Sequence, residues 1–99
     1  MSNSNIQSVQ KTATAQGVDG RARLLGAYFT HTATSATLTL RSGGASGTIK
    51  LRLTTPSAIG SQDLLIPDAG ILFEDGIHIT LSSAEITSVT LLFEGGAPA

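Results

Sequence analysis

The sequence predicts an all-β protein, a single small antiparallel β-sandwich of the jelly-roll or Ig-like type with about seven to eight strands. Several short runs alternate apolar and polar residues, which is the period of a half-buried strand. No window repeats its apolar residues with the period of a helix. Gly, Pro and Asp turn signals separate the runs at spacings of about ten residues, as in sandwiches and barrels.

The run at residues 23–31 carries apolar side chains on both faces of the predicted strand. Alternation gives two faces of three residues each, namely Leu25, Ala27 and Phe29, and Leu24, Gly26 and Tyr28. A strand with one face in water is usually polar on that face. This strand is therefore expected in the centre of a sheet or beneath a partner.

Residues 36–41 and 48–54 predict two strands with one apolar and one polar face, joined by a glycine-rich loop. The residues expected to point into the core are Leu38, Leu40, Ile49, Leu51 and Leu53. The residues expected to point outward are Thr37, Thr39, Arg41, Lys50 and Arg52. Pro56 ends the second strand because it has no N–H to donate to a ladder.

Four further apolar runs follow Pro56, at residues 64–66, 71–73, 77–81 and 87–93. They complete the expected core with Ile66, Phe73, Ile77, Ile79, Leu81, Val89, Leu91 and Phe93. His78 alternates with Ile77 and Ile79, so its side chain is expected to face solvent or a partner.

The domain organisation expected from these patterns has three parts. Residues 1–16 are polar and thinly hydrophobic, which indicates an N-terminal arm or a loose first strand. Residues 17–95 form the β-sandwich domain, and residues 96–99 form a short C-terminal tail.

The charge balance argues against nucleic acid as a partner. Six Lys and Arg face seven Asp and Glu, the net charge is −1 and the pI is about 6.0. Nucleic-acid-binding domains usually carry a basic stripe and a high pI.

No apolar run approaches the roughly 18 residues of a membrane span, so no membrane association is expected. The chain has no cysteine, which excludes disulfides and thiol catalysis and fits assembly in a reducing cytoplasm.

The loop Gly43–Gly47 resembles a functional loop only in composition. A phosphate-binding P-loop needs Lys and Ser or Thr directly after its last glycine, followed by a helix. Here Thr48 follows Gly47 and opens a predicted strand. A hydrolase elbow needs a second glycine where Thr48 stands, two residues after Ser46. The expected structure is a hairpin with a flexible loop.

No catalytic, cofactor-binding or metal-binding residue is expected, and the chain is predicted not to be an enzyme. His31 and His78 are the only histidines, and nothing around them has the spacing of a metal site. Four of the acidic residues, Asp63, Asp68, Glu74 and Asp75, fall in predicted turns, where Asp normally stays exposed and bonds its own backbone.

The candidate residues are instead contacts with a protein partner. Arg41, Lys50 and Arg52 form an outward cationic face that suits an acidic partner, or that protects the strands from stray pairing. Ile6 and Val9 are the larger apolar residues of the N-terminal segment, which is polar enough to need a partner in order to fold.

Three stretches carry a family resemblance: GRARLLGAYFT, LRSGGASGTIKLRLTTP and LLIPDAGILFEDGIHITLSSAEITSVTLLFEG, which together cover most of residues 20–94. They resemble small β-sandwich virion proteins of tailed bacteriophages. The resemblance implies a capsid decoration or cement protein on the virion surface, assembled in the host cytoplasm. Its implied partners are the major capsid protein and further copies of itself in a homotrimer. The alternative is a tail, neck or fibre component that binds another virion protein or a host surface.

Overall fold

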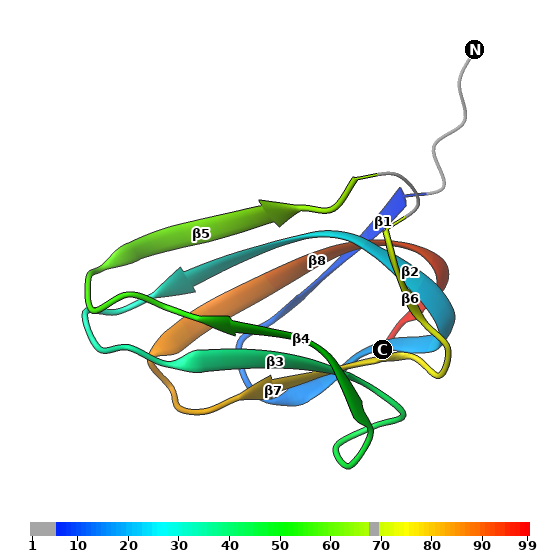
Figure 1. Cartoon of the computed structure of the whole chain (residues 1–99), viewed down its shortest axis with the longest axis horizontal. Helices are drawn as coiled ribbons and strands as arrows, with labels where there is room; N and C mark the ends of the chain where they lie inside the picture. The colour runs from blue at the N-terminus through cyan, green and yellow to red at the C-terminus, as the bar shows by residue number, and fades with distance from the viewer. Residues whose placement is uncertain (1–5, 68–69) are drawn as a thin grey trace.

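The computed structural model describes residues 6–67 and 70–99, which form strands and turns without a helix (Figure 1). The prediction of an all-β fold with about seven to eight strands is confirmed. The eight strands are β1 (Ile6–Lys11), β2 (Ala15–His31), β3 (Thr37–Ser42), β4 (Thr48–Thr54), β5 (Gly60–Leu65), β6 (Ile71–Phe73), β7 (Ile77–Leu81) and β8 (Ile86–Pro98). Within the described ranges there is consequently no helix suited to crossing a bilayer.

All eight strands pair antiparallel in one sheet, in the order β1-β8-β2-β7-β3-β4, with β5 and β6 also paired to β2. The 17-residue β2 connects two layers of this sheet. Its first residues pair with β7, and its second half pairs with β8 and β5. One layer therefore contains β1, β8, the second half of β2 and β5. The other contains the start of β2, β7, β3 and β4, and Figure 1 shows how β2 curves between them.

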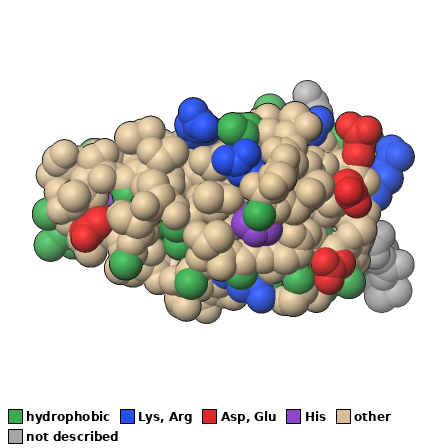
Figure 2. Space-filling view, turned by 90° about the horizontal axis from the view of Figure 1, so that it is seen from below, with side chains coloured by type: hydrophobic (Ala, Val, Ile, Leu, Met, Phe, Trp, Pro, Cys, Tyr) green, Lys and Arg blue, Asp and Glu red, His purple; other side chains and the backbone are tan. Residues whose placement is uncertain are grey.

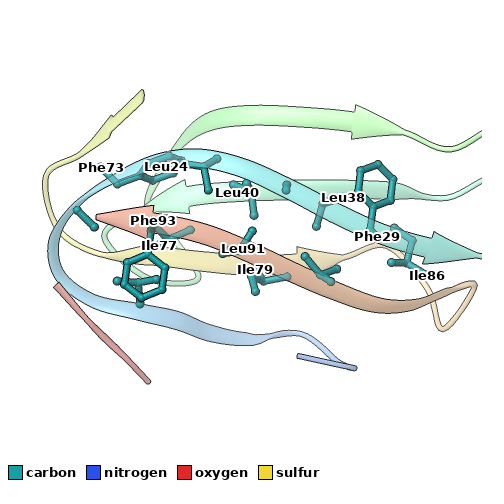
Figure 3. Close-up of a cluster of buried hydrophobic side chains, with 14 of the residues drawn as sticks. Leu24, Phe29, Leu38, Leu40, Phe73, Ile77, Ile79, Ile86, Leu91 and Phe93 are labelled. Carbon is teal, nitrogen blue, oxygen red and sulfur yellow. The ribbon is translucent and has the colours of Figure 1, made fainter. Parts of the chain in front are cut away.

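The core fills the space between the two layers with side chains from both (Figure 3). Its largest fully buried side chains are Phe73, Phe93, Leu24, Leu38, Leu40, Ile77, Ile79, Ile86, Leu91, Val18 and Val89. Val9, Leu51, Leu53, Ile66 and Leu81 pack against its margin. Alternation along β3, β7 and β8 predicted most of these positions, because each strand presents one face to the core.

A β-bulge in β2 changes which residues share a face, and the expected faces of residues 23–31 are partly wrong. Leu24 pairs with Phe93 and Gly26 pairs with Leu92, so Leu25 is an extra residue without an opposite partner on β8. One extra residue reverses the alternation on one side of the bulge. Leu24 is consequently buried on the same side as Ala27 and Phe29, while Leu25 is only half-buried.

A second bulge corrects the expected position of Ile49 on β4. Leu40 pairs with Leu51 and Arg41 pairs with Ile49, which leaves Lys50 as the extra residue. The reversal moves Ile49 from the core face to the outer face, opposite Arg41, and its side chain is 41% exposed. Alternation from Leu51 and Leu53 alone does not reveal this change, because a bulge has no obligatory sequence signal.

Both ends of the described chain belong to the sheet, which matches the first-strand alternative expected for residues 1–16 and differs from a free tail at residues 96–99. Residues 6–11 form β1 and pair with β8, so this part of the segment 1–16 is a first strand. The boundary expected at residue 17 falls inside β2. At the other end β8 continues to Pro98, where Ala97 pairs with Asp19, and Ala99 N donates a hydrogen bond to Gly17 O at 3.0 Å. Residues 1–5 lie outside the described ranges.

Candidate functional site

The three cations expected to form one binding face, Arg41, Lys50 and Arg52, have different environments. Arg41 lies on β3 between His78 of β7 and Ile49 of β4. Its Nη1 donates to Gly47 O at 3.3 Å, and its Nε is buried without a hydrogen-bond partner. Arg41 is therefore partly covered and directed along the hairpin.

Lys50 and Arg52 differ in whether they have an ionic partner. Lys50 Nζ lies 3.6 Å from Glu74 Oε1, next to the turn between β6 and β7. Arg52 sits opposite Thr39 on the outer face and makes no hydrogen bond or ion pair with the described residues. Of the three predicted cations, Arg52 is the one that is exposed and unpaired among the residues that the structure describes.

The loop at Gly43–Gly47 joins β3 and β4 in the expected hairpin, and it is also hydrogen-bonded to a neighbouring turn. Gly43 N donates to Asp75 O at 3.2 Å, and Asp75 N donates to Ser42 Oγ at 3.1 Å. Gly47 N closes the loop on Gly44 O at 2.9 Å. The tip of the β3–β4 hairpin and the turn between β6 and β7 lie about 30 positions apart in the sequence. These hydrogen bonds hold the two loops together, and we call residues 42–47 and 74–76 the joined tip.

The two candidate residues of β1 lie on opposite faces. Val9 pairs with Leu91 and packs against the core, so its role is structural. Ile6 pairs with Glu94 on the outer face and is 53% exposed. Ile6 is therefore the member of this pair that lies at the surface.

Both histidines are buried, which corrects the expected exposure of His78. His31 Nδ1 donates to Thr32 O at 3.2 Å, and its ring lies 6.5 Å from that of Phe29. His78 Nδ1 lies 3.2 Å from Thr80 Oγ1. His78 lies on the outer face between Gln16 of β2 and Arg41 of β3, and only 9% of it is exposed. No group of three or more His, Asp or Glu side chains in the described ranges is placed to hold a metal ion.

The surface that the sequence did not single out is the outer side of the layer formed by β1, β8, β2 and β5. Ile6, Tyr28, Leu65 and Leu92 lie on it and are 37–75% exposed; we call it the apolar face. Leu65 and Leu92 approach each other over Gly26, where an added Cβ would lie 3.4 Å from Leu65 Cδ2 and 3.5 Å from Leu92 Cδ1. The one sequence signal was the apolar character of both faces of residues 23–31.

The rest of the described surface is poor in charge and has shallow hollows. Figure 2 shows a face on which backbone and side chains that are neither hydrophobic nor charged predominate, with acidic side chains at both ends and more of them at one end. One hollow of about 300 Å³ is lined by small, hydroxyl and aliphatic side chains between the turn after β1 and the turn after β7. Another, of about 220 Å³, is lined by Arg21, Arg23, Leu72 and Glu94, among others. Neither gathers a set of catalytic groups.

Comparisons of the chain with protein-family models, with curated proteins and with solved structures found no match. The candidate function consequently rests on the surfaces described above and on the resemblance stated from the sequence.

Proposed function

We propose that this protein is a structural component of a larger protein assembly, and specifically a decoration protein on the capsid of a tailed bacteriophage. The observation that carries the binding role is the apolar face, where two leucines, a tyrosine and an isoleucine are exposed on one side of one layer. Large apolar side chains exposed on one face of a small domain commonly mark a protein interaction site, and here Leu65 and Leu92 meet over Gly26. The assignment to a phage capsid rests on the resemblance of residues 20–94 to phage virion proteins.

The proposed mechanism is attachment to several subunits of the major capsid protein at once. The apolar face and the available Arg52 lie on the outer sides of different layers, so they can contact different neighbours. Contacts that are weak one by one then add through multivalency. The implied homotrimer, the virion location and assembly in the host cytoplasm remain predictions from the resemblance, with no cofactor or nucleic acid involved.

The deciding experiment is the copy number of this protein in purified virions. Quantitative mass spectrometry should find it in numbers comparable to the major capsid protein. Numbers comparable to a tail ring would contradict the capsid role, and its absence from virions would remove the phage assignment altogether.

A set of surface variants tests which face attaches. Leu92→Ser and Arg52→Ser should each lower the amount of protein retained on virions after washing, because each removes an exposed contact. Lys50→Ser is the matched control, since Lys50 is already paired with Glu74. Retention of both variants at the level of the control would contradict these two contacts.

A tail, neck or fibre component is the second candidate, and the joined tip of residues 42–47 and 74–76 favours it. Binding loops are commonly presented on a rigid scaffold, and hydrogen bonds between Gly43 and Asp75 and between Asp75 and Ser42 hold these two loops together. Immunogold labelling confined to the tail would support this candidate over capsid decoration.

A further inference from the structure

Strand β5 (Gly60–Leu65) leaves one edge without a neighbour in the described structure. It pairs with β2 alone, and Figure 1 shows it as the outermost strand of its layer. Ile66 N donates to Leu25 O at 2.9 Å. Because successive residues of an antiparallel strand point their N–H groups to opposite edges, those of Ser61, Asp63 and Leu65 point to the free edge. A row of main-chain donors and acceptors is therefore available to another strand.

The side chains along this edge are also unprotected. Ile59, just before β5, is 82% exposed and Leu65 is 75% exposed, more than any other large apolar residue of the described chain. Natural edge strands usually discourage pairing with lysines, prolines or bulges. The strand itself contains none of these, and its single charge is Asp63.

We propose that β5 pairs antiparallel with β5 of a second copy, around a twofold axis at Gln62. This register places Asp63 of one copy opposite Ser61 of the other. It also brings Leu65 beside the segment at Ile59 of the other copy. The two most exposed apolar side chains are then covered by each other.

Neighbouring registers fit the sequence less well. An axis at Asp63 places the two Asp63 carboxylates directly opposite each other, where like charges repel. An axis at Ser61 places Asp63 against Ile59 and Leu65 against Ser57, so aliphatic side chains meet polar ones. The pattern of charge and apolar residues therefore selects Gln62.

The dimer extends the apolar face across two copies. Leu65 already lies beside Leu92 over Gly26, and Ile59 of the second copy continues this row. The proposal depends on the β5 edge and does not require the phage assignment. It predicts a dimer with twofold symmetry, whereas the resemblance implies a trimer. The mass of the protein assembly in solution therefore distinguishes the two proposals.

The first experiment is sedimentation equilibrium of the full chain over a range of concentrations. The expected mass approaches twice the 10.1 kDa of the chain as concentration rises. Leu65→Ser and Ile59→Ser should each weaken self-association about tenfold or more, because each change removes two apolar contacts per dimer. Ile49→Ser, an exposed isoleucine of the β4 edge, is the matched control and should leave it unchanged. Circular dichroism checks that each variant is folded.

The second experiment tests the register with single cysteines in a chain that has none. The two Gln62 residues form a non-hydrogen-bonded pair with Cα atoms about 4.5 Å apart, within the range that a disulfide spans. Gln62→Cys should therefore form a disulfide-linked dimer quickly on mild oxidation. Asp63→Cys should form one more slowly, because the two residues at position 63 are diagonal neighbours, farther apart than a directly opposite pair. A mass of one chain or of three at every concentration would overturn the proposal. So would faster cross-linking of Asp63→Cys, or association that Leu65→Ser and Ile59→Ser leave unchanged.

Discussion

Strands β4 and β5 are both edges of the sheet, but only β4 carries features that oppose further pairing. β4 has a bulge at Lys50, a second cation at Arg52 and half-buried leucines that face the core. β5 is regular, carries one charge and has its most exposed aliphatic side chain, Leu65, at its end. The two edges therefore differ in how readily they pair with another strand: β4 opposes such pairing and β5 is open to it.

This difference between the edges also changes the interpretation of the cations of the β3–β4 hairpin, Arg41, Lys50 and Arg52. A bulge twists an edge out of line, and charges on it raise the free energy of stray pairing. Lys50 provides both features, and Glu74 holds its ammonium group beside the adjacent turn. The alternative that the sequence left open, protection of the edge, accounts for Lys50 better than binding of an acidic partner does.

The largest expected effect on stability comes from Gly76, in the turn between β6 and β7 that is hydrogen-bonded to the β3–β4 hairpin. Gly76 has φ +83°, and a Cβ there would lie 2.5 Å from Val18 O, a main-chain atom. Gly76→Ala should lower the free energy of unfolding by about 3 kcal/mol or more, since strain and a collision add. Gly44→Ala, at φ +87° with nothing within 4 Å, should cost only about 1 kcal/mol. Urea unfolding of both variants measures the difference, and equal losses would show that the collision is relieved.

The next effect concerns the residue that fixes the end of β4 to the start of β3. Thr55 is buried, and its Oγ1 accepts a hydrogen bond from Ala36 N at 2.8 Å. Thr55→Val keeps the shape but leaves that buried N–H unsatisfied, which should cost about 1–3 kcal/mol in urea unfolding. Thr54→Val, at the exposed neighbouring position, is the control. A loss no greater than that of the control would mean that water replaces the hydroxyl.

The sequence predicted which side chains face the core along some strands and misplaced others. Alternation found the faces of β3, β7 and residues 89–93 of β8 because these segments keep a constant period against their neighbours. It did not find the buried Ile86, because the pairing of β8 with β2 shifts register between Ser88 and Ile86. It misplaced Ile49 and Leu24 because each is separated from its reference residues by a bulge. A bulge depends on how two strands pair, and that information is not local. The apolar face was missed for a related reason, since Leu65 and Leu92 meet over Gly26 only after distant strands pair.

A direct comparison of the two edges uses one leucine from each. Leu51 of β4 packs against the core, whereas Leu65 of β5 is mostly exposed. Leu51→Ala should lower the free energy of unfolding by about 1–2 kcal/mol, below the cost of a fully buried leucine. Leu65→Ala should cost less than about 0.5 kcal/mol, provided that unfolding is measured at dilutions where the chain is monomeric. A larger loss at Leu65 than at Leu51 would contradict the assignment of β5 as the edge with its side chains free.

The smallest effect should come from the ion pair at the bulge. Lys50 Nζ and Glu74 Oε1 are 3.6 Å apart, and the Glu74 side chain is 69% exposed. Such pairs contribute about 0–1 kcal/mol because water and salt screen them. Lys50→Gln should therefore lower the free energy of unfolding by less than about 0.5 kcal/mol, and added salt should reduce that loss. Arg52→Gln, which breaks no ion pair, should change stability less and without salt dependence. Because the pair contributes so little to stability, a strong increase in self-association of Lys50→Gln would indicate that Lys50 protects the β4 edge.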